Sequence, residues 1–220
     1  MIRFLTIVSL VMDDAKKIKM VFSDRMMRRY AGAAKHFISC YEDSPFEVRT
    51  ACEVGVGPYC FLQPFLGIAE KMILIEPNAD LAAHTRTYMP SEYVYEYAVT
   101  HRDDVFYYRD YGANGEGFLS MLEWAPIKDQ GAKANRVIDR YKVTGRTFDF
   151  FDDGKIDVIN IDCEGGEHFV LDRMISRPRL LQIEVHSTNP KHEDIKNWLA
   201  ENEYVVIKQV STHTAVYSRK

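Results

Sequence analysis

Short apolar runs alternate with helical patterns from about residue 50 to the C-terminal end of this chain. The strand-like runs occupy residues 50–54, 71–76, 93–100, 104–111, 141–148, 155–162 and 179–186, and helical patterns fall at 58–70, 78–89, 167–176 and 189–203. Such alternation predicts an α/β fold with a doubly wound, mostly parallel sheet that helices cover on both faces. The last two runs, 204–211 and 214–220, predict an antiparallel terminal hairpin.

The 220 residues suit one large domain with a full core. Apolar residues recur every three or four positions from about 13 to 41, which predicts an N-terminal helical extension over 1–47, followed by a single globular unit over 48–220. The first twelve residues hold one basic residue and no cleavage-site pattern, so we interpret them as structural. No apolar run approaches the roughly 20 residues of a membrane span, so we expect no membrane contact.

The charge and the cysteines narrow the functional classes. A formal net charge of −4 argues against a nucleic-acid-binding protein, which usually carries a basic face. The four cysteines form no CxxC pair and have no metal-finger spacing. A reducing, cytoplasmic compartment is therefore the expected location.

The turn after the first strand has the composition of a ligand-binding turn. Its candidate cofactor-binding residues are Glu53, Gly55, Gly57, Pro58 and Tyr59. Two glycines one residue apart let the backbone turn tightly and approach a ligand. A dinucleotide site would have a third glycine where Cys60 stands, and Glu53 would repel a pyrophosphate but attract a sulfonium. The alternative is a tight strand-to-helix turn that binds nothing.

The second strand ends in a carboxylate whose spacing from the glycine turn is informative. Glu76 lies 21 residues after Gly55, a spacing at which an acidic residue accepts the hydroxyl groups of an adenosine ribose. Pro77 and Asn78 follow, with Asn78 as a helix cap, and we include both in the cofactor site. A solvated carboxylate near a helix N-terminus is the alternative interpretation of Glu76.

Two further segments complete the predicted cofactor site. Ala98 and Val99, at the end of the third strand, offer small apolar surfaces for an adenine ring. The glycine-containing segment 112–140 has no regular pattern, and we expect a long loop that closes over the ligand, with Ser120 near the carboxylate of the cofactor. A plain surface loop explains this segment equally well.

The stretch VINIDCEGGEHFVL, residues 158–171, runs from an apolar strand directly into charge. We predict catalytic roles for Asp162, Glu164, Glu167 and, at the tip of the next strand, His186. Asp162 is also a predicted cofactor-binding residue, because a side chain at this strand tip can face either the cofactor or the acceptor. Acidic residues at a helix N-terminus explain Glu167 without any function. They do not explain Asp162, because a carboxylate that ends a buried strand needs a partner or a ligand.

With the glycine turn, LIEPN, YAVT and LLQIEVH, this stretch resembles the FkbM family of S-adenosylmethionine-dependent methyltransferases over about residues 48–218. The family pattern K-I-D-V-E-G-A-E is followed at Ile161, Asp162, Glu164, Gly165, Glu167 and Leu171. The sequence departs from the family at Asn160, Cys163 and Gly166, at Glu53 where aspartate is frequent, and in the turn 57–59. The resemblance implies a seven-stranded Rossmann-like fold, S-adenosylmethionine as methyl donor and S-adenosylhomocysteine as product.

Family members typically methylate a hydroxyl oxygen, so the resemblance also implies a small-molecule or glycan acceptor, such as a sugar or natural product. A divalent metal held by Asp162, Glu164, Glu167 and His186 is a less favoured alternative, and we predict a site without metal. A non-catalytic binding module and an NAD-type oxidoreductase stay open as other functions. The N-terminal helices are compatible with a homo-oligomer.

Overall fold

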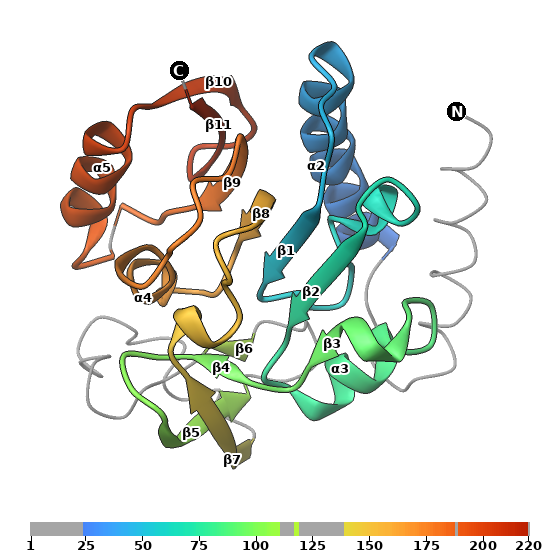
Figure 1. Cartoon of the computed structure of the whole chain (residues 1–220). Coiled ribbons are helices and arrows are strands. Elements are labelled where there is room, and N and C mark those ends of the chain that lie inside the picture. Colours follow the sequence, from blue (N-terminus) through green and yellow to red (C-terminus); the bar gives the residue numbers. More distant parts are fainter. Residues whose placement is uncertain (1–23, 111–116, 119–138, 188, 220) are drawn as a thin grey trace.

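The computed structural model describes residues 24–110, 117–118, 139–187 and 189–219, and its centre is a seven-stranded sheet (Figure 1). The strand order is β10-β11-β9-β8-β1-β2-β3. The strands are β1 Thr50–Val54, β2 Lys71–Ile75, β3 Val94–Tyr95, β8 Ile156–Ile161, β9 Leu180–Glu184, β10 Tyr204–Gln209 and β11 Thr214–Arg219. Neighbours are parallel from β9 to β3, whereas β11 is antiparallel to both β9 and β10. The predicted fold class and terminal hairpin are confirmed.

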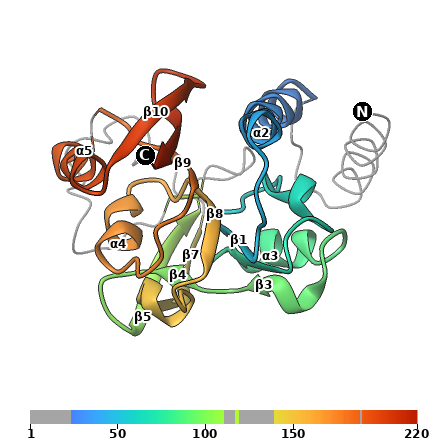
Figure 2. The ribbon, with the colours of Figure 1, turned by 45° about the horizontal axis from the view of Figure 1, so that its top comes forward.

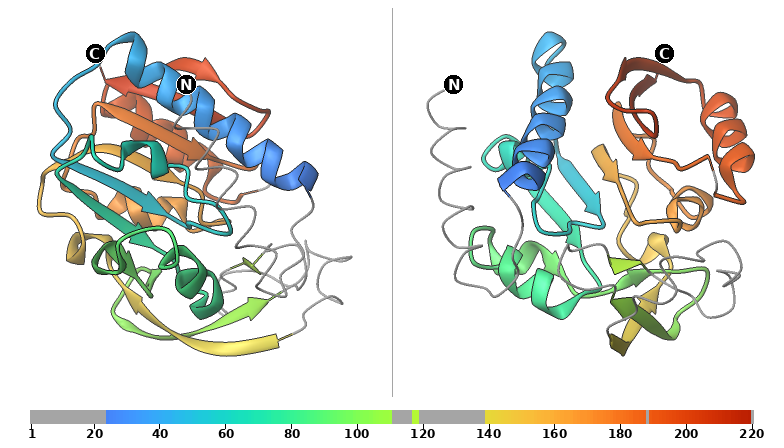
Figure 3. Two further views of the ribbon diagram at one scale, coloured as in Figure 1. Left: turned by 90° about the vertical axis from the view of Figure 1, so that its right-hand side faces the viewer. Right: turned by 180° about the vertical axis from the view of Figure 1, so that it is seen from behind.

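Helices lie on both sides of this sheet (Figures 1 and 3). They are α2 Asp24–Asp43, α3 Ala79–Thr85, α4 Glu167–Asp172 and α5 His192–Glu201. Because successive side chains of a strand point to opposite faces, β1 contributes to two cores. Ala51 packs in the core that includes Phe37 of α2, and Cys52 packs in the core that includes Val170 of α4 and Ile195 of α5.

A second, four-stranded sheet has the order β4-β7-β5-β6. All four strands are labelled in Figure 1, and Figure 2 shows β4, β5 and β7 from another side. Its strands are β4 Ala98–Val99, β5 Asp104–Asp110, β6 Gly117–Phe118 and β7 Asp139–Arg146. The single strand predicted over 93–100 is wrong, because this segment is divided between the two sheets. Val94 and Tyr95 pair with β2, but Ala98 and Val99 pair with β7, so the chain leaves the large sheet between them.

The helix predicted over 58–70 is also wrong. Turns and one 3-10 helix, Gln63–Phe65, occupy this segment. The backbone N–H groups of Phe61 and Leu62 donate to the carboxylate of Glu53, which takes them out of any helical ladder. Gly67, at φ +86°, then turns the chain away.

The predicted cap of the next helix is confirmed. Asn78 precedes α3, and its side-chain oxygen accepts hydrogen bonds from the backbone N–H groups of Asp80 and Leu81 at 3.0 and 3.2 Å. The cap, which is two residues after Glu76, thereby fixes the start of α3 at Ala79. In the part of the chain that the structure describes, no helix has both the length and the apolarity of a membrane span.

Candidate functional site

Four strand tips form a row along one edge of the large sheet. Because β9, β8, β1 and β2 are neighbours and run parallel, their carboxyl ends meet at this edge. The residues at or just beyond these ends are Glu184, Asp162, Gly55 and Glu76, in spatial order. Such an edge is where open α/β sheets bind ligands.

The glycine turn is built against the tips of its two neighbours. The N–H of Gly55 donates to the carbonyl of Ile75 on β2, and the N–H of Asp162 donates to the carbonyl of Val54, both at 2.9 Å. Gly55 has φ +82°, and a Cβ there would collide with the carbonyl group of Asp162, whose carbon would lie 2.8 Å away. Only glycine fits this position.

Gly57 has a different environment. Its φ is +60°, which favours glycine, yet a Cβ built there would meet no atom within 4 Å. The side of the turn at Gly57 is therefore open, as a turn that contacts a ligand through its backbone would require.

Glu76 links Gly57 to the end of the second strand through a hydrogen bond. Its carboxylate accepts hydrogen bonds from the N–H groups of Gly57 and Asn78, each at 2.8 Å, while the residue is only 4% exposed. Burial raises the pKa of Glu76 to about 7, against the lowering effect of these two hydrogen bonds. A carboxylate has about four acceptor positions. The two bonds leave capacity for further donors, such as ribose hydroxyl groups.

Glu53, which we expected to face a cationic ligand, lies fully inside the protein. The residue is 0% exposed. Its carboxylate accepts hydrogen bonds from the thiol of Cys60 at 3.0 Å and from the N–H groups of Phe61 and Leu62 at 2.9 and 3.0 Å. Burial raises the pKa of Glu53 to about 7. This carboxylate therefore shapes the segment after the glycine turn and does not line an open rim.

A ladder of buried polar side chains continues from Glu53 across the sheet. Asn160 on β8 donates from its amide to the Glu53 carboxylate at 3.2 Å, and Gln182 on β9 donates to the amide oxygen of Asn160 at 2.8 Å. The three residues are consecutive register partners on β1, β8 and β9. Asn160, one of the departures from the family pattern, thus satisfies a buried carboxyl group with a neutral donor.

Other predicted cofactor residues lie around this edge. Pro58 and Tyr59 are buried in the glycine turn, and the ring centroid of Tyr59 lies 6.1 Å from that of Phe61. Pro77 is half-buried between Glu76 and the capping Asn78.

Two more cofactor predictions concern the third strand and the long loop. Ala98 and Val99 belong to β4 and are buried in the core beneath α4, at 0% and 4% exposure. Their side chains therefore pack within the protein. Ser120 lies outside the described residues.

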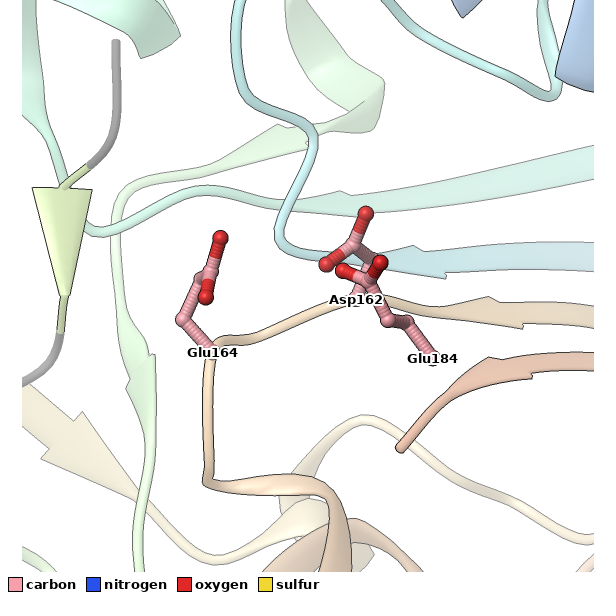
Figure 4. A group of neighbouring side chains, drawn as sticks. All are labelled: Asp162, Glu164 and Glu184. Atoms are coloured by element: carbon pink, nitrogen blue, oxygen red, sulfur yellow. The ribbon is translucent and has the colours of Figure 1, made fainter. Parts of the chain in front are cut away.

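Three carboxylates converge at the tips of β8 and β9 (Figure 4). An oxygen atom from each of Asp162, Glu164 and Glu184 lies within 4.8 Å of the other two, and all three residues are half-buried. We call this set the acidic trio. Asp162 and Glu164 were predicted, but Glu184 was missed, although it ends the apolar run LLQI just as Asp162 ends INI.

Like charges at this spacing alter the protonation of Asp162. Burial, then the charge of Glu184 and a hydrogen bond with it, then the charge of Glu164, raise the pKa of Asp162 well above its ordinary value. The neutral form of the Asp162 carboxyl group is therefore favoured by its surroundings. The oxygen atoms of the trio also have a spacing that a divalent cation could bridge.

His186 lies beside the trio, as predicted. Its Nε2 atom is 3.8 Å from a carboxylate oxygen of Glu184 and 4.0 Å from one of Glu164. Its ring centroid lies 4.6 Å from that of His213, in the loop between β10 and β11. His213 was not predicted, because nothing in its local sequence indicates that the terminal hairpin reaches this edge.

Glu167 is buried at the start of α4 and stabilises the turn after β8 through hydrogen bonds. At 2% exposure, it accepts hydrogen bonds from the N–H of Gly165 at 2.8 Å and from the side chain of Asn189 at 3.0 Å. Burial raises the pKa of Glu167 to about 7. Both carboxylate oxygens thus accept hydrogen bonds within the protein, which gives Glu167 a structural role at this turn, and its catalytic role stays a prediction.

The same turn positions Glu164. This residue has φ +54°, a left-handed conformation that non-glycine residues seldom adopt, and Gly165 follows at φ +106°. The turn carries the Glu164 side chain across from Asp162 and Glu184 (Figure 4). A sparsely populated backbone conformation thus holds one member of the trio in place.

Comparison with known proteins gives one family match. Residues 57–206 match the model of the methyltransferase FkbM domain. This range covers more than half of the chain and includes Glu76, the trio and His186. No curated protein sequence matches the chain.

Several solved structures of methyltransferases are distantly similar to this chain. A proposed RNA methyltransferase from Pyrococcus horikoshii is 9% identical with TM-score 0.47, over 100% of this chain and 99% of that one. The FkbM methyltransferase of Methylobacillus flagellatus is 10% identical with TM-score 0.44, over 98% and 57%. Magnesium protoporphyrin IX methyltransferase of Synechocystis is 12% identical with TM-score 0.44, over 90% and 85%. These likenesses are too distant to transfer an activity or a substrate.

Proposed function

The chain belongs to the FkbM methyltransferase family, and from this premise we propose that it transfers a methyl group from S-adenosylmethionine to a hydroxyl oxygen. The acceptor is a sugar, a glycan or a small molecule resembling a natural product. The observation that carries this proposal is the row of strand tips, in which an open glycine turn lies between Glu76 on one side and the acidic trio on the other.

The row of strand tips supports one orientation of the bound cofactor along the edge of the sheet. Glu76 at β2 has acceptor capacity for the ribose hydroxyl groups, and Gly57 offers open backbone next to it. The methionine half would then extend along the edge past β1 toward Asp162. The acceptor would lie beyond it, near Glu184 and His186 at β9.

The residues at the β8 and β9 tips fit the needs of hydroxyl methylation. S-adenosylmethionine, when bound, supplies an electrophilic methyl group on a positively charged sulfur. The protein must then orient the acceptor and take the proton that its hydroxyl group loses. Asp162 and Glu164 are half-buried carboxylates at this place, so they can accept hydrogen bonds from a polyhydroxylated acceptor and remove a proton.

Calorimetric titration tests the cofactor proposal. We expect heat of binding with S-adenosylmethionine and S-adenosylhomocysteine, and none with NAD. Binding of NAD alone would favour the oxidoreductase alternative, which the family match already opposes. Absence of binding by both methyl-donor ligands would overturn the proposal.

A labelled cofactor tests the reaction. We suggest incubating the protein with 13C-methyl S-adenosylmethionine and pools of glycans and hydroxylated small molecules. Oxygen-, nitrogen- and carbon-bound methyl groups resonate in different regions of a carbon NMR spectrum, so the product signal identifies the atom that was methylated. Tight cofactor binding without any labelled product in broad acceptor pools would favour the binding-module alternative.

We also propose that the protein functions in a reducing cellular compartment. All four cysteines are free, and Cys52 and Cys60 are fully buried within the fold. Free thiols are typical of proteins in reducing compartments.

A further inference from the structure

The glycine turn carries a buried hydroxyl group without a hydrogen-bond partner. Tyr59 is 1% exposed, and its hydroxyl has no partner among the residues that the structure describes. Buried polar groups are normally paired, so an unpaired one needs a reason. We propose that the Tyr59 hydroxyl donates a hydrogen bond to the carboxylate of the cofactor's methionine part. This inference rests on the proposed methyl transfer and assigns the group that holds one end of the methyl donor.

Tyr59 belongs to the same turn as the open glycine. It follows Gly57 by two residues, and the N–H of Gly57 donates to the carboxylate of Glu76 at 2.8 Å. The turn 57–59 is one of the places where the sequence departs from the family pattern. The phenol is therefore a feature of this chain, and it lies beside the position proposed for the ribose.

The interior of the protein offers this hydroxyl no free acceptor at the nearest carboxylate. Burial, then the charges of Cys60 and Glu53, raise the pKa of Tyr59 well above its ordinary value, so the hydroxyl keeps its proton and acts as a donor. A carboxylate has about four acceptor positions. Those of Glu53 are taken by the thiol of Cys60, the N–H groups of Phe61 and Leu62 and the amide of Asn160. The acceptor for Tyr59 must therefore come from a ligand.

The ring of Tyr59 is held by its neighbour along the chain. Its centroid lies 6.1 Å from that of Phe61, and the two rings meet edge to face with 88° between their planes. Because the hydroxyl is closed to solvent in the free protein, contact with a ligand requires a small movement of the ring toward the open side of the turn at Gly57.

The electrostatics of the edge select the carboxylate as the group that Tyr59 meets. With the ribose at Glu76 on β2, the methionine part extends past β1 toward Asp162 on β8. This part ends in an ammonium and a carboxylate. The acidic trio attracts the first and repels the second, so the carboxylate turns toward the donors of the glycine turn. Ser120, which we expected near this carboxylate, lies outside the described residues.

A second buried acceptor is placed differently. The amide oxygen of Gln182 also has no partner among the described residues. Gln182 lies inside β9, between its neighbours β8 and β11, and its amide nitrogen donates to Asn160. The sheet encloses this oxygen on both sides, whereas Tyr59 belongs to the turn at the edge where a ligand enters.

The experiment compares two ligands that differ in the carboxylate. Decarboxylated S-adenosylmethionine keeps the adenine, the ribose, the sulfonium and the ammonium, and lacks only the carboxylate. We propose to measure the dissociation constants of both ligands by calorimetry for the wild-type protein and for Tyr59→Phe, which lacks only the hydroxyl. Urea unfolding of the free proteins shows whether the substitution changes their stability.

We expect Tyr59→Phe to weaken the binding of S-adenosylmethionine by about tenfold to about a hundredfold, the range for a hydrogen bond to a charged group. The affinity for the decarboxylated ligand should not change. The midpoint of urea unfolding should not fall, because the substitution removes a hydroxyl that has no partner.

Tyr204→Phe is the matched control. Tyr204 is buried at 6% exposure, and its hydroxyl donates to the carbonyl of Pro178 at 2.9 Å. Its loss should lower the midpoint of urea unfolding and leave the affinity for S-adenosylmethionine as in the wild type.

The outcomes separate the inference from the proposed function. If the wild-type protein binds S-adenosylmethionine and its decarboxylated form equally well, the inference is excluded without any variant. If Tyr59→Phe weakens both ligands by the same factor, or weakens neither, the hydroxyl does not hold the carboxylate, while the cofactor site stands. If the wild-type protein binds neither S-adenosylmethionine nor S-adenosylhomocysteine, the proposed function fails, and this inference fails with it.

Discussion

The backbone of Gly55 lies directly against the carbonyl group of Asp162, so that no side chain fits between the glycine turn and the tip of β8. The N–H of Asp162 donates to the carbonyl of Val54 at 2.9 Å, which holds the two strand tips at this separation. The turn proposed to bind the cofactor and the residue proposed to act on the acceptor therefore form one rigid unit.

Gly55→Ala should be severely destabilising. The substitution combines a left-handed backbone, which costs about 1–2 kcal/mol, with overpacking against Asp162, which costs about 1–3 kcal/mol. Gly57→Ala has the left-handed backbone but open space around its Cβ, so we expect only the first loss. Urea unfolding of both variants checks this, and equal destabilisation would contradict the close contact at Gly55.

Glu76→Gln should weaken cofactor binding by about tenfold or more, because hydrogen bonds to a charged group contribute roughly 1.5–3 kcal/mol. Both S-adenosylmethionine and S-adenosylhomocysteine should be affected, since they share the ribose. Asp80→Asn, in the exposed first turn of α3, is the control for a nearby loss of charge. If the Glu76→Gln variant binds both ligands as tightly as the wild-type protein does, Glu76 does not bind the ribose.

Stability should fall as the pH rises from about 4.5 to about 7. Glu53, Glu76 and Glu167 each have a pKa of about 7 in the folded protein against an ordinary value of 4.5. In this window the folded state keeps protons that the unfolded state has lost, so each group reduces the free energy of unfolding as the pH increases.

Glu53 offers the sharpest test of this pH dependence. Its shift from 4.5 to about 7, at about 1.4 kcal/mol per pKa unit, corresponds to roughly 3 kcal/mol. Glu53→Gln should reduce the difference in unfolding free energy between pH 4 and pH 8 by about this amount. Urea unfolding at both pH values measures it, and an unchanged difference would show that folding does not raise the pKa of Glu53.

Two glutamates near the site should respond differently to neutral substitution. Glu164→Gln should lower kcat by about 10²–10⁴-fold, as loss of a general base does, with little change in stability. Glu167→Gln should instead destabilise the protein by roughly 1–3 kcal/mol, because an amide cannot accept both of its hydrogen bonds. Methyl transfer to the acceptor found by labelling, together with thermal unfolding, separates the two effects.

The acidic trio shows how much of a functional site can be inferred from the periodicity of the sequence. The sequence places Asp162 at a strand tip because an apolar run ends there, and the same pattern was present at Glu184. The pairing of these two residues was not visible, because the register between β8 and β9 depends on contacts between segments more than 20 residues apart. His213 joins the site only through the terminal hairpin, which is still farther along the chain.

Residues 50–76 and 155–184 already determine the parallel strands, the row of tips and the position of Glu76 through local alternation and spacing. Only the tertiary structure decided which way each carboxylate turns. Glu53 faces inward because folding brings the backbone N–H groups of Phe61 and Leu62 to its carboxylate. Glu167 is bonded by the nearby N–H of Gly165 and by the side chain of Asn189, which folding brings from 22 residues away. Glu184 turns toward Asp162 at the rim. A strand pattern fixes where a carboxyl group lies along the chain, but its orientation depends on donors that the fold assembles from elsewhere.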